Sequence, residues 1–388
     1  MNVEVSLVDS SPVHSGSTSQ SLNPAHAASF KKPASRLLYP ARGDSVPARH
    51  PLPARGLVDS LNGDSPLVAI VGPTAAGKSA LALDLAERLD GEIVNCDSVQ
   101  VYRGFDVGTG KTPPPERRGI AHHLLDVVEP DQVFTAGDYR SRALHALAGV
   151  RGRGKLPIVV GGTGLYLRAL LLGLFEGPSR SEELRARLGT LAGRRGREFL
   201  HRLLARLDRK AAERIHPRDT PKIIRAVEVR LLARQPMSAM LERGRTGLKG
   251  FRVLKAGLCP ERKQLAQRIN TRVERMFAEG LLDETRAMLA RTDATGIKSL
   301  GALGYRQAGA VLRGELGLQE AVRETQAATR RYAKRQMTWF RREPGIEWFA
   351  GFGDDAEIQG QVFAWLRQVL PAVAGSGPRA TNNAASNS

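Results

Sequence analysis

Residues 72–79 have the composition and spacing of a phosphate-binding loop. The stretch GPTAAGKS fits G-x-x-x-x-G-K-[ST] through Gly72, Gly77, Lys78 and Ser79. Such glycines let backbone N–H groups surround a phosphate, the lysine neutralises its oxygens, and the hydroxyl suits Mg²⁺. We therefore expect a diphosphate or nucleotide here, with Ser79 as the metal ligand. The predicted binding residues are Gly72, Pro73, Thr74, Ala75, Ala76, Gly77, Lys78 and Ser79.

Two further motifs carry groups that could take part in proton transfer. Asp97 begins the polar run DSVQVY, where a carboxylate could bind magnesium or accept a proton. Thr163 lies in GGTG, whose glycines permit close backbone approach, and its hydroxyl could donate to a leaving oxygen. The structural alternatives are a turn or helix N-cap aspartate and a plain strand-to-helix turn.

All three motifs follow segments that predict strands, and the first of these segments is apolar on both faces, as a buried parallel strand is. These segments are residues 67–71, 92–96 and 156–160, and an amphipathic helix is expected over 78–90. Alternation of strand, loop and helix predicts an α/β core with a mainly parallel sheet. Ligands in such sheets bind outside the carboxyl ends of the strands, so the three motifs should converge on one crevice.

The composition indicates a polyanionic partner. The chain has 388 residues, a formal charge of +19 and a pI near 10.6, which favours nucleic acid first and an anionic membrane second. An arginine-rich genome is the alternative explanation. No apolar run reaches transmembrane length. The two cysteines, Cys96 and Cys259, form no CxxC pair, which fits a reducing compartment and predicts neither a disulfide framework nor a zinc site.

The chain divides into five predicted parts. Residues 1–64 are expected to be disordered. Glu4 and Asp9 argue against a transit peptide, whereas a misassigned start codon explains the segment equally well. Residues 65–178 form the first part of the catalytic core, and residues 179–215 form a small inserted helical domain. Residues 216–371 complete the core and add basic C-terminal helices, and residues 372–388 form a flexible tail.

A basic segment near the C-terminus predicts a nucleic-acid contact. Residues 328–342, ATRRYAKRQMTWFRR, have helical periodicity, and residues 323–342 contain seven Lys or Arg and one acid, Glu324. Such cations position RNA through its phosphates. Tyr332, Gln336 and Trp339 could meet unstacked bases. A solvated charged face is the alternative.

Taken together, the motifs resemble those of the bacterial-type tRNA dimethylallyltransferases, or tRNA isopentenyltransferases, of the IPP transferase family. The resemblance covers about residues 66–350, and Lys222 departs from it because the family often has Arg there. The matching stretches are GPTAAGKS, NCDSVQVYRGFDVGTGKT, HHLLD, VVGGTGLYLRAL, HPRDTPKIIRAVEV, RINTRVERMFAEGLLDE, LGALGYRQ and AKRQMTWFRR.

The resemblance implies a P-loop NTPase-like core and a prenyl transfer. A dimethylallyl group would pass from dimethylallyl diphosphate to N6 of the adenine 3′-adjacent to the anticodon, with release of diphosphate. Asp97 would be the base and Thr163 would donate to the bridging oxygen. Lys78, the loop amides, Mg²⁺ on Ser79, and Arg225 would neutralise the leaving group.

The resemblance also implies contacts with the tRNA anticodon stem-loop, which the inserted helices would clasp. We expect a cytoplasmic monomer without a membrane partner. The predicted tRNA contacts are Asp97, Ser98, Val99, Gln100, Thr163, Arg185, Pro221, Lys222, Ile223, Ile224, Arg225, Gly301, Ala302, Leu303, Gly304, Tyr305, Arg306, Lys334, Arg335, Gln336, Met337, Thr338, Trp339, Phe340 and Arg341.

Three other functions remain open at this point. A P-loop kinase or ATPase acting on RNA would explain the loop and Asp97, but neither GGTG nor the basic segment. A free-adenylate isopentenyltransferase would share the first motifs and would not need the insertion. A non-catalytic RNA-binding protein would not need Lys78, Asp97 and Thr163 together.

Overall fold

The computed structural model describes residues 64–291 and 297–370. The expected disordered segments therefore lie outside the described residues, apart from Asp64. Within the described ranges no helix is long and apolar enough to cross a membrane.

The core is a six-stranded sheet in which every neighbouring pair is parallel, in the order β3-β2-β4-β1-β5-β6. The predicted parallel sheet and its three strands, now β1, β2 and β4, are confirmed. β5 and β6 were not predicted, and they extend the sheet beyond β1. The strands are β1 Ser65–Val71, β2 Gly91–Asn95, β3 His122–His123, β4 Leu156–Val160, β5 Phe251–Leu258 and β6 Ile346–Phe349.

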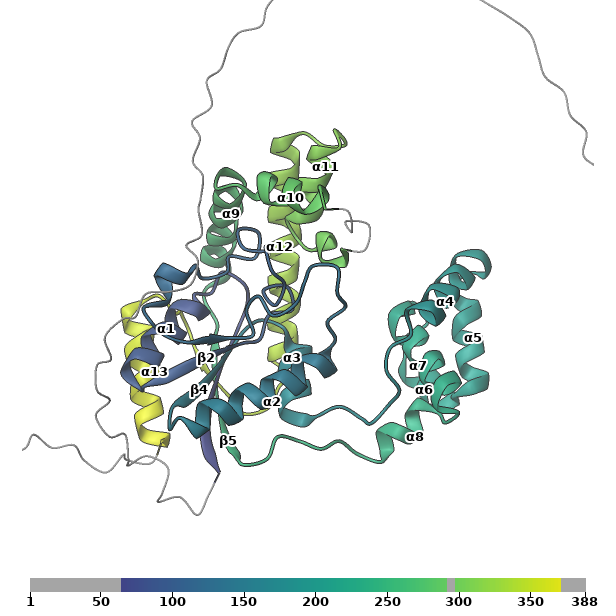
Figure 1. The fold of residues 1–388 in the computed structure, drawn as a ribbon, viewed down its shortest axis with the longest axis horizontal. Helices are drawn as coiled ribbons and strands as arrows, with labels where there is room; N and C mark the ends of the chain where they lie inside the picture. The colour runs from purple at the N-terminus through teal and green to yellow at the C-terminus, as the bar shows by residue number, and fades with distance from the viewer. Residues whose placement is uncertain (1–63, 292–296, 371–388) are drawn as a thin grey trace, which may run out of the picture. The chain divides into compact units, whose positions relative to one another are not determined.

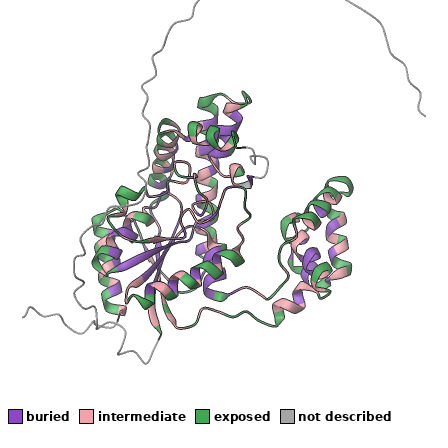
Figure 2. Ribbon diagram, viewed as in Figure 1, coloured by how far each residue is buried: buried purple, intermediate pink, exposed green. Residues whose placement is uncertain are grey.

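Helices cover both faces of this sheet (Figure 1). Helices α1 (Lys78–Arg88) and α13 (Ala356–Val369) pack on one face, and α2 (Ala136–Gly152) and α3 (Gly164–Leu172) pack on the other. Strands β1, β2 and β4 accordingly appear buried over most of their length in Figure 2. Burial on both faces explains why residues 67–71 of β1 are continuously apolar rather than alternating.

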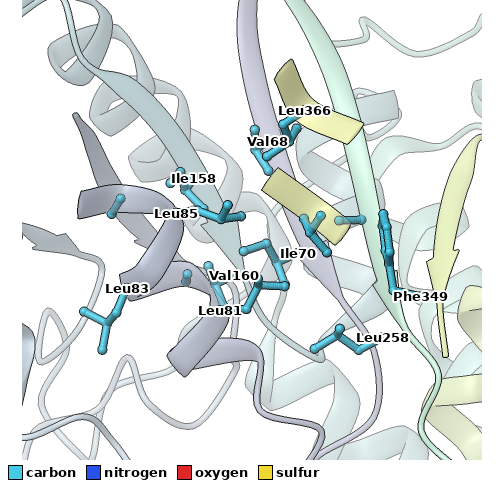
Figure 3. Packing of buried hydrophobic residues seen from close by; sticks show 14 of the residues in the cluster. Val68, Ile70, Leu81, Leu83, Leu85, Ile158, Val160, Leu258, Phe349 and Leu366 are labelled. Atoms are coloured by element: carbon cyan, nitrogen blue, oxygen red, sulfur yellow. The ribbon is translucent and has the colours of Figure 1, made fainter. Parts of the chain in front are cut away.

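The central strand β1 illustrates the packing. Its side chains alternate between the faces, so Val68 and Ile70 meet α1 and α13 while Leu67, Ala69 and Val71 meet α2 and α3. Figure 3 shows the first of these clusters, in which Ile70 lies among residues of α1, β4 and β5. Complete burial of such a side chain contributes about 1.5–3 kcal/mol, so β1 is firmly fixed, and with it the loop that follows.

The helical insertion is larger than the predicted 179–215. Five helices share one apolar cluster, and Ile223, Ala226 and Val227 of α7 are completely buried in it against Leu200 and Leu204 of α5. The apolar face of α7 needs this partner, so residues 216–242 belong to the insertion and not to the returning core. The five helices are α4 Glu182–Arg195, α5 Arg197–Leu207, α6 Arg209–Arg214, α7 Thr220–Ala233 and α8 Met237–Glu242.

Four helices after β5 bring C-terminal residues to the phosphate-binding loop. They are α9 Arg262–Ala278, α10 Leu281–Leu289, α11 Tyr305–Leu312 and α12 Leu318–Phe340. Helix α12 contains the predicted basic segment up to Phe340, where the helix ends, and it begins earlier, at Leu318. Ala333 of α12 and Ile269 of α9 pack together with Ala75 of the loop.

Candidate active site

The three motifs meet at the carboxyl ends of β1, β2 and β4, as predicted. The Cys96 N–H donates to Val160 O at 2.7 Å, and the Gly161 N–H donates to Ile70 O at 3.2 Å. The Ser98 N–H donates to Thr163 Oγ1 at 3.1 Å. These bonds continue the strand ladder beyond the sheet and place Asp97 and GGTG next to the loop.

A cavity of about 800 Å³ lies at this edge of the sheet. Helices α9 and α12 supply the part of its wall that the sequence motifs do not. Thr163 is not part of the wall, whereas Gly161 and Gly162 are. The polar side chains on the wall include Lys78, Ser79, Asp97, Gln100, Asp106, Thr109, Lys111, His122, Arg268, Arg272, Arg275, Tyr332, Gln336 and Asp354.

The phosphate-binding loop needs its glycines. Gly77 has φ +81°, and a Cβ atom there would lie 2.7 Å from the Gly353 backbone nitrogen. Gly353 itself donates its N–H to Ala76 O at 2.8 Å, so this close approach is part of the fold. Helix α1 begins at Lys78, immediately after the loop, and its first-turn N–H groups provide a site for an anion.

Lys78 is the residue of the phosphate-binding loop whose pKa is shifted. Its ammonium donates to Pro73 O at 2.7 Å. Burial lowers the pKa of Lys78 from its usual 10.5 to about 8, and the nearby Arg272 lowers it further, against the opposing effect of Asp97. An anion bound beside Lys78 would restore its charge, so this lysine is prepared for an anionic ligand.

Asp97 fits both interpretations given for it from the sequence, a turn aspartate and a carboxylate that faces a ligand. One carboxylate oxygen, Oδ1, accepts from the Val99 N–H at 2.8 Å and the Gln100 N–H at 3.4 Å, which is the turn geometry. Within the described residues Oδ2 has no hydrogen-bond partner, and Asp97 lines the cavity. The turn therefore orients the carboxylate and leaves one oxygen for a ligand.

Thr163 lies behind the cavity wall among hydroxyl groups. Its Oγ1 donates to Ser98 Oγ at 3.4 Å, a long hydrogen bond, in addition to accepting from the Ser98 N–H. Tyr332 of α12 lies on the cavity wall, and burial raises the pKa of its phenol to about 12. The phenol is therefore neutral at physiological pH.

Gln336 joins two of the motifs and is not free to read a base, which corrects its predicted role. Its Oε1 accepts from the Thr74 N–H at 2.8 Å, and its Nε2 donates to Gly162 O at 3.0 Å. The side chain is only 6% exposed. Both polar ends are used, so Gln336 fixes the phosphate-binding loop to GGTG.

Arg272 is the functional candidate that the sequence analysis missed. Lys78 and Arg272 are the cationic residues on the wall that, within the described residues, form no ion pair with a carboxylate. Lys111, Arg268 and Arg275 are paired with Asp106, Asp354 and Glu279. Burial lowers the pKa of Arg272, whereas Asp97 raises it. The signal was present in RINTRVER, whose arginines 268, 272 and 275 share one helical face.

Arg225, the predicted diphosphate ligand, is held inside the insertion. Its Nη1 donates to Glu228 Oε2 at 2.7 Å and its Nη2 to Pro178 O at 3.0 Å, and it is not part of the cavity wall. Arg185, a predicted tRNA contact, binds the same fully buried Glu228 at 3.0 Å through both Nε and Nη2. Both guanidinium groups satisfy a buried carboxylate, which lowers the pKa of Glu228 despite its burial.

Comparison with known protein sequences shows the family to which the chain belongs. The profile of the IPP transferase family matches residues 100–343. The tRNA dimethylallyltransferase of Koribacter versatilis is 54% identical over 304 residues, which are 78% of this chain and 99% of the relative. The chain belongs to the IPP transferase family. A second relative in the family, the tRNA dimethylallyltransferase of Solibacter usitatus, is 53% identical over 76% of this chain and 95% of its own length.

Solved structures of the family share the fold. The tRNA isopentenylpyrophosphate transferase of Bacillus halodurans is 37% identical, with a TM-score of 0.56, over 78% of this chain and 97% of its own. A eukaryotic dimethylallyltransferase acting on tRNA is 25% identical, with a TM-score of 0.66, over 79% of this chain and 78% of its own.

Several side chains that the family resemblance suggested for tRNA contact are buried, which corrects those predictions. Ile223, Tyr305 and Phe340 are 0%, 1% and 1% exposed because each packs in an apolar cluster. Gly304 is buried as well. The predicted contacts that are exposed, and so remain candidates, are Pro221, Lys222, Gly301, Arg306, Lys334, Arg335, Thr338 and Arg341.

The remaining predicted contacts are half-buried. Trp339 is one of them, and the Arg168 guanidinium lies over its ring at 4.5 Å from the centroid. This cation–π contact occupies one face of the indole and limits its use as a base-stacking surface. The others are Asp97, Ser98, Val99, Gln100, Thr163, Arg185, Ile224, Arg225, Ala302, Leu303 and Met337.

Proposed function

We propose that this chain transfers a dimethylallyl group from dimethylallyl diphosphate to the exocyclic N6 of an adenine beside the anticodon of tRNA. The observation that carries the proposal is the 54% identity to a tRNA dimethylallyltransferase over 99% of that relative's length. The site supports it, because an anion-binding loop and the Asp97 carboxylate line one cavity and the Thr163 hydroxyl lies behind its wall, bonded to Ser98.

The diphosphate would lie on the phosphate-binding loop. The loop amides and the first turn of α1 supply fixed dipoles, and Lys78 and Arg272 supply charges that no carboxylate on the described chain neutralises. Arg272 replaces Arg225 in this proposal, since the Arg225 guanidinium is bound to Glu228.

Asp97 would act as the base. The adenine N6 lone pair is delocalised into the ring, so this amine is a weak nucleophile unless its proton is removed as the bond forms. In the reaction N6 forms a bond to the allylic carbon, the bond from that carbon to the bridging oxygen breaks, and the N6 proton passes to Asp97. Its Oδ2 is available for this role because Oδ1 alone holds the turn.

Thr163 would donate to the bridging oxygen as that oxygen gains charge. Its contact with Ser98 Oγ is long, at 3.4 Å, and is therefore readily exchanged for a stronger acceptor. Inorganic diphosphate then leaves from the loop.

A magnesium ion fits the donors at this site. The Ser79 hydroxyl is exposed on the cavity wall, and Mg²⁺ commonly takes one such protein oxygen together with substrate phosphate oxygens and waters. Ser79 would hold it. Within the described residues no group of three or more His, Cys, Asp or Glu is placed to hold a metal, so a site completed by the substrate is the fitting type. The ion would supply charge neutralisation.

The tRNA anticodon stem-loop would meet the exposed cations of α12. Lys334, Arg335 and Arg341 are exposed on or directly after this helix, whose buried residues face the cavity and the core. Phosphate contacts of this kind set the register of the RNA and leave base recognition to other groups. We further propose that the enzyme acts as a monomer in the cytoplasm and has no membrane partner.

The acceptor can be identified directly. The full-length protein would be incubated with radiolabelled dimethylallyl diphosphate and either unmodified tRNA or AMP. We expect label in tRNA alone, and none in a matched tRNA that carries another base in place of the adenine beside the anticodon. Label in AMP would instead identify a free-adenylate transferase, and label in neither acceptor would refute prenyl transfer.

A further inference from the structure

A carboxylate on α10 holds a loop that the active-site motifs do not include. Glu284 Oε2 accepts from the backbone N–H groups of Asp106 at 3.0 Å and Val107 at 2.9 Å, and Oε1 accepts from Gly108 at 3.3 Å. The buried Tyr305 hydroxyl donates to Oε1 at 2.5 Å. Glu284 therefore binds four donors, from two segments far away in the sequence.

These donors indicate a geometric role for Glu284. Within the described residues it forms no ion pair with a lysine or arginine. Hydrogen bonds from neutral N–H and O–H groups to a carboxylate are short and directional, so they fix the position of the donors. A Cβ atom at Gly108 would lie 2.5 Å from the Tyr305 ring, which shows how closely the loop rests on this pair.

The same loop is anchored at its other end. The Lys111 ammonium donates to Tyr102 O at 3.0 Å and forms 2.6 Å ion pairs with Asp106 and Asp126. Its side chain is only 3% exposed, so these partners hold it fully. Residues 106–111 are thus fixed both by Glu284 and by Lys111.

The loop of residues 106–111 in turn holds the side chain of Arg272. The carbonyl oxygen of Thr109 accepts from Arg272 Nη2 at 3.1 Å and from Gln100 Nε2 at 3.2 Å. A Cβ atom at Gly110 would lie 2.0 Å from Arg272 Nη2, so the guanidinium lies directly against the loop backbone. On the other side, Arg272 shares the cavity wall with Lys78 and Asp97, and it is close enough to Lys78 to lower the pKa of that ammonium.

We propose that Glu284 is a positioning residue for the diphosphate substrate: it fixes residues 106–108, and the adjoining Thr109 carbonyl then aims Arg272 at the anion on the phosphate-binding loop. This inference rests on the proposed function, because it requires the diphosphate to bind between Lys78 and Arg272. Glu284 itself does not line the cavity.

The test compares Glu284→Gln with Asp283→Asn. Both replace a carboxylate on the first turn of α10 with an amide, but Asp283 is exposed and paired with Arg286. Binding of inorganic diphosphate to the full-length protein would be measured by calorimetry, and binding of unmodified tRNA by filter retention. In Glu284→Gln one acceptor becomes an NH₂ group facing N–H donors, so we expect diphosphate binding about tenfold weaker. We expect tRNA affinity to be unchanged, and Asp283→Asn to match wild type in both.

The two binding measurements separate positioning from a general loss of structure. Misfolding would lower both affinities together, so diphosphate binding that weakens while tRNA binding is unchanged identifies positioning. Tyr305→Phe removes a single donor and should weaken diphosphate binding about threefold, and it decides the matter if Glu284→Gln does not fold.

Two results would overturn the proposal. One is unchanged diphosphate binding in Glu284→Gln, or in Tyr305→Phe where only that variant folds. The other is an equal loss of diphosphate and tRNA binding. Lys78→Ala tests the diphosphate site separately from the role of Glu284. Diphosphate binding that survives this change would refute the proposed site itself.

Discussion

Diphosphate binding should fall steeply at alkaline pH because of Lys78. Burial and the nearby Arg272 lower the pKa of Lys78 to about 8 in the free protein. A bound diphosphate places negative charge beside the ammonium and raises its pKa. Binding then takes up a proton between the two pKa values. Affinity is therefore fully retained below about pH 8 and is lost as the pH rises through that value.

The size of the effect follows from the free-protein pKa. At pH 9 about one Lys78 side chain in ten remains charged, so affinity should be about tenfold lower than at pH 7. Each further pH unit should cost another factor of about ten, equal to about 1.4 kcal/mol, until the pKa of the bound state is reached.

The assay is calorimetric titration with inorganic diphosphate from about pH 7 to about pH 9.5, at constant ionic strength. Lys78→Arg is the matched control, because a guanidinium stays charged over this range. The pH dependence that remains in Lys78→Arg therefore comes from diphosphate itself and from the other titrating groups. Identical pH profiles for wild type and Lys78→Arg would refute the reasoning, since the alkaline loss would then not originate at Lys78.

Four further outcomes follow from the site. Asp97→Asn should lower turnover by about 10²–10⁴-fold with tRNA affinity intact, whereas equal losses of rate and tRNA binding would assign Asp97 to docking. Thr163→Ala should lower turnover by about 10²–10³-fold with Thr163→Ser close to wild type, and a normal rate at saturating substrates would exclude the hydroxyl. Replacing Lys334 and Arg335 with alanine should reduce the slope of log K against log salt by about one to two units between about 50 and about 200 mM, and an unchanged slope would mean that this face is merely solvated. Gln336→Leu leaves the buried Gly162 carbonyl and the half-buried Thr74 N–H unpartnered, at about 1–3 kcal/mol each. The melting temperature should therefore fall by about 3 °C or more, and an unaltered melting curve would show that Gln336 is not a structural link.

The sequence determined the features that depend on local chain chemistry. Residues 67–71 are apolar on both faces, which a covered parallel strand accommodates. The loop glycines and Lys78 predict an anion site, because in a phosphate-binding loop the backbone N–H groups at the start of the following helix bind anions. Parallel topology then places motifs that follow strands at one edge.

The extent of the insertion depended on packing that a single segment does not reveal. Helix α7 follows a polar stretch, so its sequence alone did not distinguish a return to the core from a further helix of the insertion. Three completely buried residues, Ile223, Ala226 and Val227, settle this, because their partners lie on the preceding helices. The same packing explains why Arg225 serves Glu228 and not a diphosphate.

The site's remaining polar groups were decided by the tertiary structure alone. Gln336 bonds to Thr74 across 262 residues, and Arg272 bonds to Thr109 across 163. In the sequence, a glutamine in a basic helix suggests a side chain that contacts RNA, and an arginine in a charged helix suggests a side chain exposed to solvent. Their roles differ because buried backbone groups must be hydrogen-bonded, and only the folded chain determines which side chains come within reach of them.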